Sequence, residues 1–400
     1  MNKVIDYFYL KDIGFLELLF SMYIILCGYS TPISASVLFV IVMDLLAIYR
    51  TKGIHHVIYK PLQYFFLFFL IHDVITMIIA PDATFSSINA LIGTLIILYS
   101  IPIIVNAINI NKLKGSLNVV AIVSVLGMIY HAGILATGGI PSPLTIPFMP
   151  FQFGNEDYSM ELFRPTSFFI EPQAYVSFIL VPLFISLIDK KYLWSVVLLF
   201  SMLLSTSTTG IITSFLIIAL YMTSQKIGYA KLILMGVVLF GLYYLLINTT
   251  IFTQGVEKLQ GTDFSSSVRV SQGLEIVKKM DGSEYLFGAS YMTIPGFAIN
   301  RGLGTMIENN NAFMSTVWFM LLRFGAVGLF LYLYIFIAAL KKNRQLRPYI
   351  VIYIVTMFSN TDTIGGFFAF SCIVVLVFLF KENQLNTNKN ENSAYRVGIR

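Results

Sequence analysis

Residues 164–188 read RPTSFFIEPQAYVSFILVPLFISLI, a short polar stretch that runs directly into an apolar segment. Arg164 and Glu171 stand seven positions apart, where the apolar run 173–188 begins. A charged side chain in hydrocarbon costs roughly 2.5–3.5 kcal/mol for Arg at the centre of a span, so such residues are usually paired or functional. The stretch therefore predicts either an ion pair at the start of a membrane helix, with Pro172 as its first residue, or the edge of an active site.

The composition indicates that the whole chain is a membrane protein. Of its 400 residues, 57% are hydrophobic and only 12% are charged, and the mean hydropathy is +0.80. A soluble fold does not need so many apolar residues, because much of its surface faces water. Cys27 and Cys372 both lie in apolar runs, so neither a disulfide framework nor a metal cluster is expected. We expect an all-α, polytopic membrane helix bundle.

Apolar runs that are long enough, or nearly so, to cross about 30 Å of hydrocarbon recur along the chain. We predict about twelve transmembrane helices in one integral membrane domain, residues 1–382, followed by a disordered, Asn-rich tail at 383–400. The run 311–340 is too long for one span, which suggests a short first helix at the membrane surface. The predicted helices cover residues 13–29, 33–49, 61–80, 89–108, 117–136, 173–188, 192–206, 211–224, 232–251, 311–340, 349–358 and 364–380.

The basic residues predict an orientation. Nineteen of the 26 Lys and Arg residues fall in alternate connections or at the ends of the chain. Because cytoplasmic loops carry an excess of basic residues, these connections and both termini are expected in the cytoplasm. The opposite face then carries two large loops, about 137–172 and 252–310. Within the second loop, residues 265–280 have the pattern of an amphipathic helix that rests on the membrane.

Basic residues on the outer face need their own explanation, because they oppose this trend. The planar guanidinium group of arginine binds phosphate and carboxylate oxygens in a bidentate manner. A cluster of arginines at the outer bilayer surface suits a lipid phosphate or pyrophosphate head group. Arg164 and Arg269, each close to Ser or Thr, favour this interpretation, whereas Lys278 and Lys279 are more typical of a solvated helix face.

Other chemistry-bearing residues are few. The chain has no HExxH, CxxC, Walker A or GxGxxG motif, which disfavours zinc-dependent hydrolysis and ATP-driven transport. His72 and Asp73 are neighbours within the third predicted helix, where they either relay protons or simply pair inside the bundle. His131, near the outer end of the fifth predicted helix, is more typical of a packing residue than of a substrate contact.

Two stretches resemble a known family. Residues 164–184, RPTSFFIEPQAYVSFILVPLF, resemble the Arg-x-x-Ser-Phe-Phe-x-Glu-Pro element that opens a membrane helix in Wzy-type polymerases of O-antigen and capsular polysaccharide. Residues 205–212, STSTTGII, resemble the Ser-Arg-Thr-Gly helix start of these polymerases and of the related O-antigen ligases. Here Thr208 stands where the family commonly has an arginine.

Two weaker elements extend the resemblance toward the C-terminus. SSSVR at 265–269 followed by Gly288 is similar to the family's second-loop arginine and its glycine turn. Residues 308–311, leading to the stretch 325–328, resemble the final loop-to-helix element. The ligases usually carry a histidine near that point and this chain has none, which favours a polymerase.

The resemblance implies an inverting, metal-independent glycosyltransferase without a cofactor. It would transfer a growing glycan from undecaprenyl pyrophosphate to a lipid-linked repeat unit at the outer face of a bacterial cytoplasmic membrane. Its implied partners are these lipid-linked oligosaccharides, membrane lipid, a chain-length regulator and a flippase, and no nucleic acid. Arg164, Arg269 and Arg301 would bind pyrophosphate, and Glu171 or Glu308 would act as the base.

Two alternatives stay open beside this interpretation. One is a transporter or flippase for the same lipid-linked oligosaccharides, and the other is an O-antigen ligase. Transporters tend to show inverted repeats and broken helices near the midplane of the membrane. The two halves of this chain show no similarity to each other, and the residues suited to chemistry gather on one predicted face. The sequence leaves open whether the glycan belongs to lipopolysaccharide, capsule or exopolysaccharide.

Overall fold

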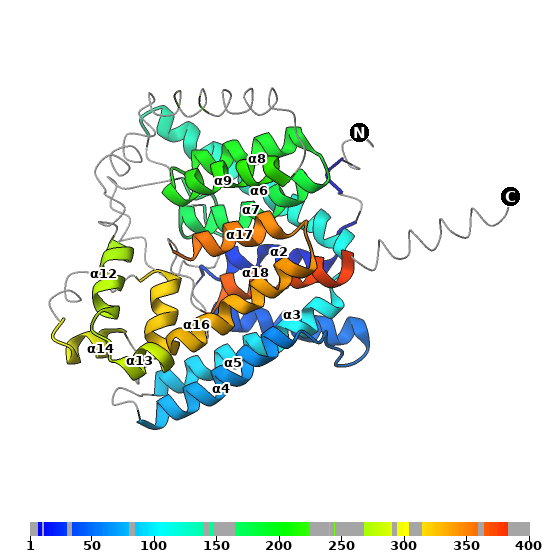
Figure 1. The fold of residues 1–400 in the computed structure, drawn as a ribbon. Coiled ribbons are helices and arrows are strands. Elements are labelled where there is room, and N and C mark those ends of the chain that lie inside the picture. Colours follow the sequence, from blue (N-terminus) through cyan, green and yellow to red (C-terminus); the bar gives the residue numbers. More distant parts are fainter. Residues whose placement is uncertain are drawn as a thin grey trace.

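The structure, a computed structural model, describes residues 7–9, 12–29, 34–79, 85–139, 144–147, 165–224, 240, 244, 268–289, 294–303, 314–358 and 364–382. These residues form helices and no β-strand (Figure 1). Four helical segments among them are long and apolar enough to cross a membrane: Lys60–Ile79, Ile88–Ala107, Ile110–Ala136 and Thr316–Lys342. Six further apolar helices are shorter. The expected all-α fold is confirmed for the described residues, and the apolar helices are consistent with a membrane helix bundle.

The helices follow the apolar runs of the sequence. Eleven of the twelve predicted apolar helices coincide with helices of the structure, and the twelfth, 232–251, lies almost wholly outside the described residues. Much of the two predicted loops and all of the tail 383–400 also lie outside them. The helices that match the predicted runs are α2 (Phe15–Leu26), α3 (Ala35–Thr51), α4 (Lys60–Ile79), α5 (Phe85–Ala107), α6 (Ile110–Ala136), α7 (Pro172–Ile188), α8 (Tyr192–Leu204), α9 (Thr208–Ser224), α16 (Thr316–Lys342), α17 (Arg347–Thr356) and α18 (Gly366–Val377), which continues as the π-helix η5 (Phe378–Glu382).

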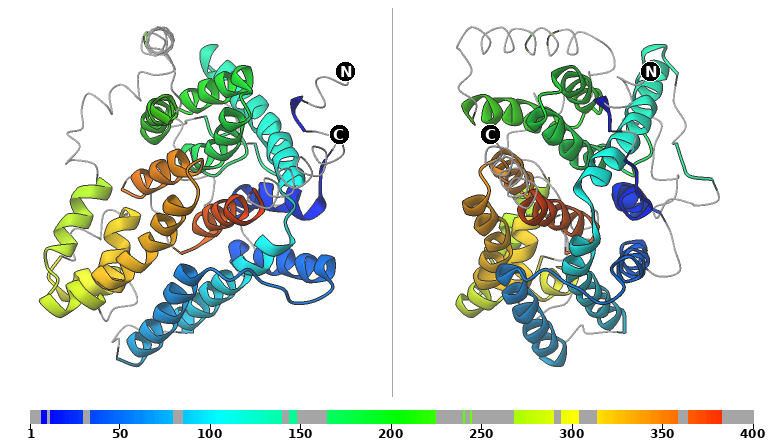
Figure 2. Two further views of the ribbon diagram at one scale, coloured as in Figure 1. Left: turned by 45° about the vertical axis from the view of Figure 1, so that its right-hand side comes forward. Right: turned by 90° about the vertical axis from the view of Figure 1, so that its right-hand side faces the viewer.

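The bundle is built around α18. Residues 368–377 of this helix are all buried, because α2, α5 and α16 pack around it. In both views of Figure 2, α4 and α5 run along one edge of the bundle, and α7, α8 and α9 lie on the other side of α18. The outer face of α4 exposes an apolar stripe at helical spacing, Leu67, Ile71, Ile75 and Ile78. Such a stripe is expected where a helix faces lipid.

Basic residues from different connections meet at one end of the bundle, which we call the basic end. The ammonium group of Lys342, at the end of α16, lies 5.7 Å from the ring centre of Tyr59, just before α4. Lys381 in η5 donates to the carbonyl oxygen of Asn106 in α5 at 2.9 Å. The connections that the sequence predicts on one face therefore share one end of the structure.

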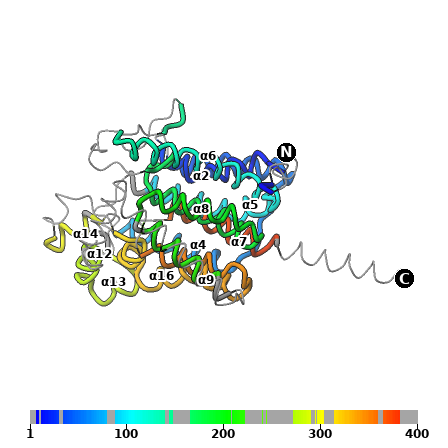
Figure 3. The backbone as a smooth tube through the Cα atoms, turned by 90° about the horizontal axis from the view of Figure 1, so that it is seen from above, coloured from blue at the N-terminus to red at the C-terminus, as the bar shows by residue number. Residues whose placement is uncertain are grey.

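Three short helices lie at the opposite end, which we call the loop end (Figure 3). They are α12 (Val268–Val277), α13 (Gly282–Phe287) and α14 (Ile294–Asn300). On α12, Ile276 and Val277 are buried in a small apolar core shared with α14 and α16, while the Lys278 and Lys279 side chains that follow are exposed. This confirms the amphipathic helix predicted within residues 265–280 and the solvated positions of the two lysines.

Candidate functional site

The stretch before α7 is folded against α6 and α7 at the loop end. Thr166 and Ser167 are buried, and Phe169, 1% exposed, packs with its ring centre 5.5 Å from that of Phe178. The backbone N–H of Thr166 donates to Nδ1 of His131 at 3.4 Å. His131 is fully buried and so helps to hold this stretch against α6, as expected for a packing residue.

Glu171 stands at the exposed start of α7. Its backbone is extended, its carbonyl oxygen accepts the N–H of Ala174 at 3.1 Å, and its side chain is exposed and makes no capping bond. Pro172 is the first helical residue, as predicted, because its missing N–H is not needed in the first turn. Arg164 lies outside the described residues, so the predicted ion pair between Arg164 and Glu171 stays a prediction.

The structure describes the other three predicted site residues, Arg269, Glu308 and Arg301, to different extents. Arg269 lies on α12, but its side chain and the whole of Glu308 are outside the described residues. Arg301 follows α14, and its guanidinium group lies 2.9 Å from a carboxylate oxygen of Asp281 and 2.7 Å from one of Glu284. The hydrogen bond to Asp281 and the negative charges of both partners raise the pKa of Arg301. A phosphate that binds Arg301 has to compete with two carboxylates.

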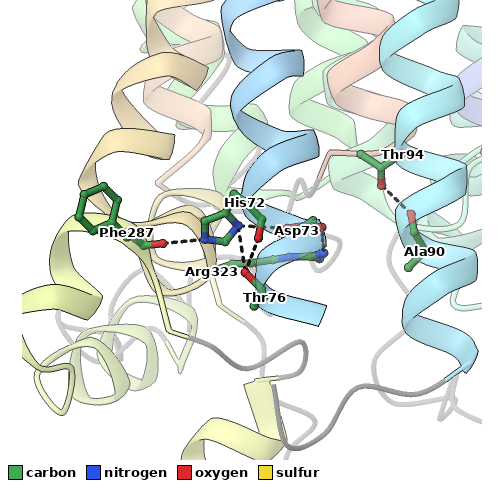
Figure 4. A network of polar contacts seen from close by, with 7 residues as sticks. All are labelled: His72, Asp73, Thr76, Ala90, Thr94, Phe287 and Arg323. Atoms are coloured by element: carbon green, nitrogen blue, oxygen red, sulfur yellow. Dashed lines mark hydrogen bonds and ion pairs between the residues drawn. The ribbon is translucent and has the colours of Figure 1, made fainter. Parts of the chain in front are cut away.

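A second charged group lies inside the bundle near the loop end (Figure 4). We call it the Asp73 cluster: His72, Asp73 and Thr76 of α4, with Arg323 of α16. The Asp73 side chain is 0% exposed, and its Oδ2 accepts from Nη2 of Arg323 at 2.6 Å. Its Oδ1 lies 3.2 Å from Nδ1 of His72. The cluster joins two helices that are far apart in the sequence.

His72 connects the Asp73 cluster to α13. Its Nε2 lies 2.6 Å from the carbonyl oxygen of Phe287, the last residue of α13. Its Nδ1 faces the carboxylate of Asp73, and the Thr76 hydroxyl beside it donates to the His72 carbonyl oxygen at 2.6 Å. Both ring nitrogens therefore face acceptors.

Two glycines allow α13 and α16 to touch through their backbones. Gly325 interrupts α16 with φ of 65°, and a Cβ atom there would lie 2.3 Å from the carbonyl oxygen of Leu286. Gly288 has φ of 85°, and a Cβ atom there would lie 2.1 Å from the carbonyl oxygen of Arg323. No other residue type fits either position without displacing backbone. The long run that the sequence suggested to be two helices is thus divided at Gly325.

The Ser/Thr-rich turn between α8 and α9 is a packing element in the described structure. The hydroxyl of Ser205 donates to the carbonyl oxygen of Met202 at 2.6 Å, and that of Ser214 to the carbonyl oxygen of Gly210 at 2.6 Å. Gly210 packs tightly, since a Cβ atom there would lie 2.9 Å from the same Met202 oxygen. The helix begins at Thr208, although the side chain of that residue is outside the described part.

Of the predicted site residues, the described loop end shows two side chains, the exposed carboxylate of Glu171 and the partly exposed guanidinium group of Arg301. Together they provide a proton acceptor and a cation, but the structure records no contact between them. Within the described ranges, no group of three or more His, Cys, Asp or Glu side chains is placed to hold a metal ion.

Sequence reasoning did not join Asp73 to Arg323, although two opposite charges in separate apolar helices are a signal for such pairing.

Comparisons of the chain with protein-family models, with curated proteins and with solved structures find no match. The functional argument therefore depends on the residues themselves, on their placement in the fold and on the resemblance of the short motifs.

Proposed function

We propose that the protein is a membrane glycosyltransferase, a polysaccharide polymerase of the Wzy type. One observation supports this more than any other. The described parts of three of the four elements that carry the resemblance belong to the loop end: the stretch 165–172, α12 with Gly288 after α13, and the start of α16 with Gly325. The sequence shows Gly288 and Gly325 only as separate motifs, but the backbone around Gly288 contacts the backbone just before Gly325, and Ala289 N–H donates to the carbonyl oxygen of Leu322 at 2.7 Å. Residues that form one site on one face of a membrane must lie at the same end of the bundle, as these elements do.

The proposed topology follows from the basic residues. We place the basic end in the cytoplasm and the loop end at the outer face of a bacterial cytoplasmic membrane. Twelve spans, including one at 232–251, then put both termini in the cytoplasm. In this orientation the loop end receives undecaprenyl-pyrophosphate-linked oligosaccharides from the outer leaflet. It also faces any chain-length regulator that acts on the product.

The proposed chemistry assigns two roles. Negative charge grows on the departing pyrophosphate, so Arg164 and Arg269 would bind it more strongly in the transition state than in the ground state. Arg301 would join them by exchanging a carboxylate partner for a phosphate oxygen. Glu171, whose carboxylate is exposed, would accept the proton of the attacking sugar hydroxyl, with Glu308 as the second candidate. Direct displacement at the anomeric carbon would invert its configuration without a metal ion or cofactor.

A transporter of lipid-linked oligosaccharide is the second candidate, and a specific observation favours it. α16 is broken at Gly325, and the buried pair of Asp73 and Arg323 lies beside the break. Broken helices and buried charges in a membrane are typical of transporters. Against this, the break lies near one end of the bundle, ten residues after Ser315 at the start of α16, and the sequence has no inverted repeat.

A complementation experiment separates the candidates. The gene is deleted in its host and restored on a plasmid, and the surface glycan is resolved on a gel. A polymerase predicts the loss of long chains with single-unit products retained, and a flippase predicts the loss of single units as well. Glu171→Gln should abolish long chains at an unchanged protein level, whereas Lys278→Gln, on the solvated face after α12, should leave them intact. Full chain length in Glu171→Gln would exclude Glu171 as the base.

A further inference from the structure

A groove lies between α4, α5 and the connection before α4, toward the basic end. These two helices run along one edge of the bundle (Figure 2). Its volume is about 210 Å³. The walls are mainly apolar and aromatic, and include His56, Tyr59, Leu62, Phe66, Leu98 and Pro102. The groove is therefore suited to a hydrocarbon chain rather than to a sugar.

Specific bonds hold the groove open. Pro102 lies inside α5, where it has no N–H for a helical hydrogen bond. Its carbonyl oxygen accepts the N–H of Val57, in the connection before α4, at 3.3 Å. The hydroxyl of Tyr59 donates to the carbonyl oxygen of Ile335 in α16 at 2.5 Å, which fixes one wall against the bundle. These bonds tie the groove walls to the rest of the bundle, so binding would need little reordering.

Basic residues lie beside the groove, in the connection before α4 and at the end of α16. Lys60 begins α4 with an exposed side chain, three residues before Gln63 of the groove wall, and His56 and Lys52 in the same connection are exposed as well. Lys342 lies against the ring of Tyr59. Residues 51–66 and 95–108 contain no Asp or Glu, and the carboxylate that reaches α5 from α3, Asp44, accepts from the Ser100 hydroxyl at 3.2 Å.

We propose that this groove binds one anionic phospholipid, with an acyl chain between α4 and α5 and the phosphate group beside Lys60 and His56. An apolar slot beside exposed lysines matches a molecule with a hydrocarbon chain and a net negative head group. Anionic lipids are attracted to basic clusters at the cytoplasmic surface, and lysine is an established phosphate ligand. The bound lipid would join the connection before α4 to α5. This proposal does not depend on glycosyltransferase activity.

The test uses the full-length protein, purified in mild detergent and freed of lipid. Phosphatidylglycerol, phosphatidylethanolamine and inorganic phosphate are added separately, and the bound lipid is counted by native mass spectrometry alongside the thermal unfolding midpoint. Phosphatidylglycerol should bind and raise the midpoint, and the other two should not. Lys60→Gln should weaken phosphatidylglycerol binding about fivefold, as expected for the loss of about 1 kcal/mol per basic residue at the surface. Val57→Trp, which fills the groove, should abolish binding.

The matched control is Lys190→Gln, an exposed lysine between α7 and α8 on the other side of the bundle. It should bind phosphatidylglycerol like the unchanged protein. An equal loss in Lys190→Gln and Lys60→Gln would overturn the proposal in favour of a diffuse surface charge. Equal binding of the two lipids, or an equal midpoint shift with inorganic phosphate, would overturn it as well. If Val57→Trp does not fold, the comparison of the two lysine variants decides.

Discussion

Two arginine–carboxylate groups at the loop end have similar bond lengths, but one is buried and the other is partly exposed to solvent. The Arg323 pair with Asp73 is buried, with side chains 18% and 0% exposed, and the bond is 2.6 Å long. Arg301 is 28% exposed, and its partners Asp281 and Glu284 are 67% and 16% exposed, at 2.9 and 2.7 Å. The bond lengths alone would not distinguish the two groups, whereas the exposed fractions do.

The difference in exposure distinguishes a charge pair that holds the structure together from a pair that is able to exchange its partner. If a ligand took Arg323 away, Asp73 would remain charged and buried, which is costly. Arg301 can release Asp281 to water at little cost, because exposed ion pairs contribute only about 0–1 kcal/mol. The Asp73 cluster therefore holds α4, α13 and α16 together. Arg301 is the charge that an anionic substrate is able to recruit.

Breaking the buried pair should have the largest effect. Asp73→Ala leaves the Arg323 guanidinium group buried without its carboxylate, so we expect a loss of about 3–5 kcal/mol in stability, measured by unfolding in detergent. The double variant Asp73→Leu with Arg323→Leu should recover most of this loss, because it removes both charges. Equal stability of Asp73→Ala and the unchanged protein would show that the pair does not hold the helices.

The backbone contact beside the pair should be the next most sensitive feature. Gly325→Ala has no room for its methyl group and requires a left-handed backbone, so a loss of about 1–3 kcal/mol is expected. Gly133→Ala on α6 is the matched control, since a Cβ atom there meets nothing within 4 Å. It should leave the unfolding midpoint unchanged or raise it slightly. Similar losses in both variants would contradict the importance of the α13–α16 contact.

A lysine at the basic end, unlike the two arginines, should make the stability of the protein depend on pH. Burial lowers the pKa of Lys191 to about 8, although Asp189 opposes the shift. Lys191 donates to the carbonyl oxygen of Tyr7 and lies against the rings of Tyr7 and Tyr9. Between about pH 8 and the unfolded-state pKa, the unfolded chain binds more protons at this residue, so stability should rise with pH. Between pH 8 and 9.5 the unfolding midpoint should rise less in Lys191→Met than in the unchanged protein. An identical rise in both would contradict the lowered pKa of Lys191.

The exposed group should give the smallest effect on stability. Arg301→Gln removes two partly exposed ion pairs, and we expect a change of about 0–1 kcal/mol in the free energy of unfolding. Under the proposed function the same variant should nevertheless shorten the glycan. A loss of stability comparable to that of Asp73→Ala would show that Arg301 is structural and not a substrate ligand.

Local information predicted most of the fold. Hydrophobic length places the helices, and the missing N–H of proline places the start of α7 at Pro172. The apolar and polar spacing of residues 265–280 predicted α12. Each of these features depends on neighbours within a few positions, which a single sequence contains.

The long-range contacts of the site could not be predicted in the same way. Asp73 and Arg323 are 250 positions apart, and nothing local to either residue specifies the other. Likewise, the ion pairs of Arg301 depend on how the chain turns between α13 and α14. The charges themselves were visible in the sequence, because an arginine and an aspartate inside apolar runs indicate partners. Which partners they have is a property of the packing.

The most direct test of the loop end as a glycosyltransferase site is an assay with the purified protein in liposomes. Undecaprenyl-pyrophosphate-linked repeat units from the host are supplied, and glycan length and released undecaprenyl pyrophosphate are measured together. We predict a ladder of longer glycans with equivalent release of the lipid pyrophosphate, both strongly reduced in Arg164→Lys, because lysine lacks the forked donor of arginine. Glycans that stay one unit long while the lipid-linked units cross the bilayer would contradict the proposal and identify a transporter.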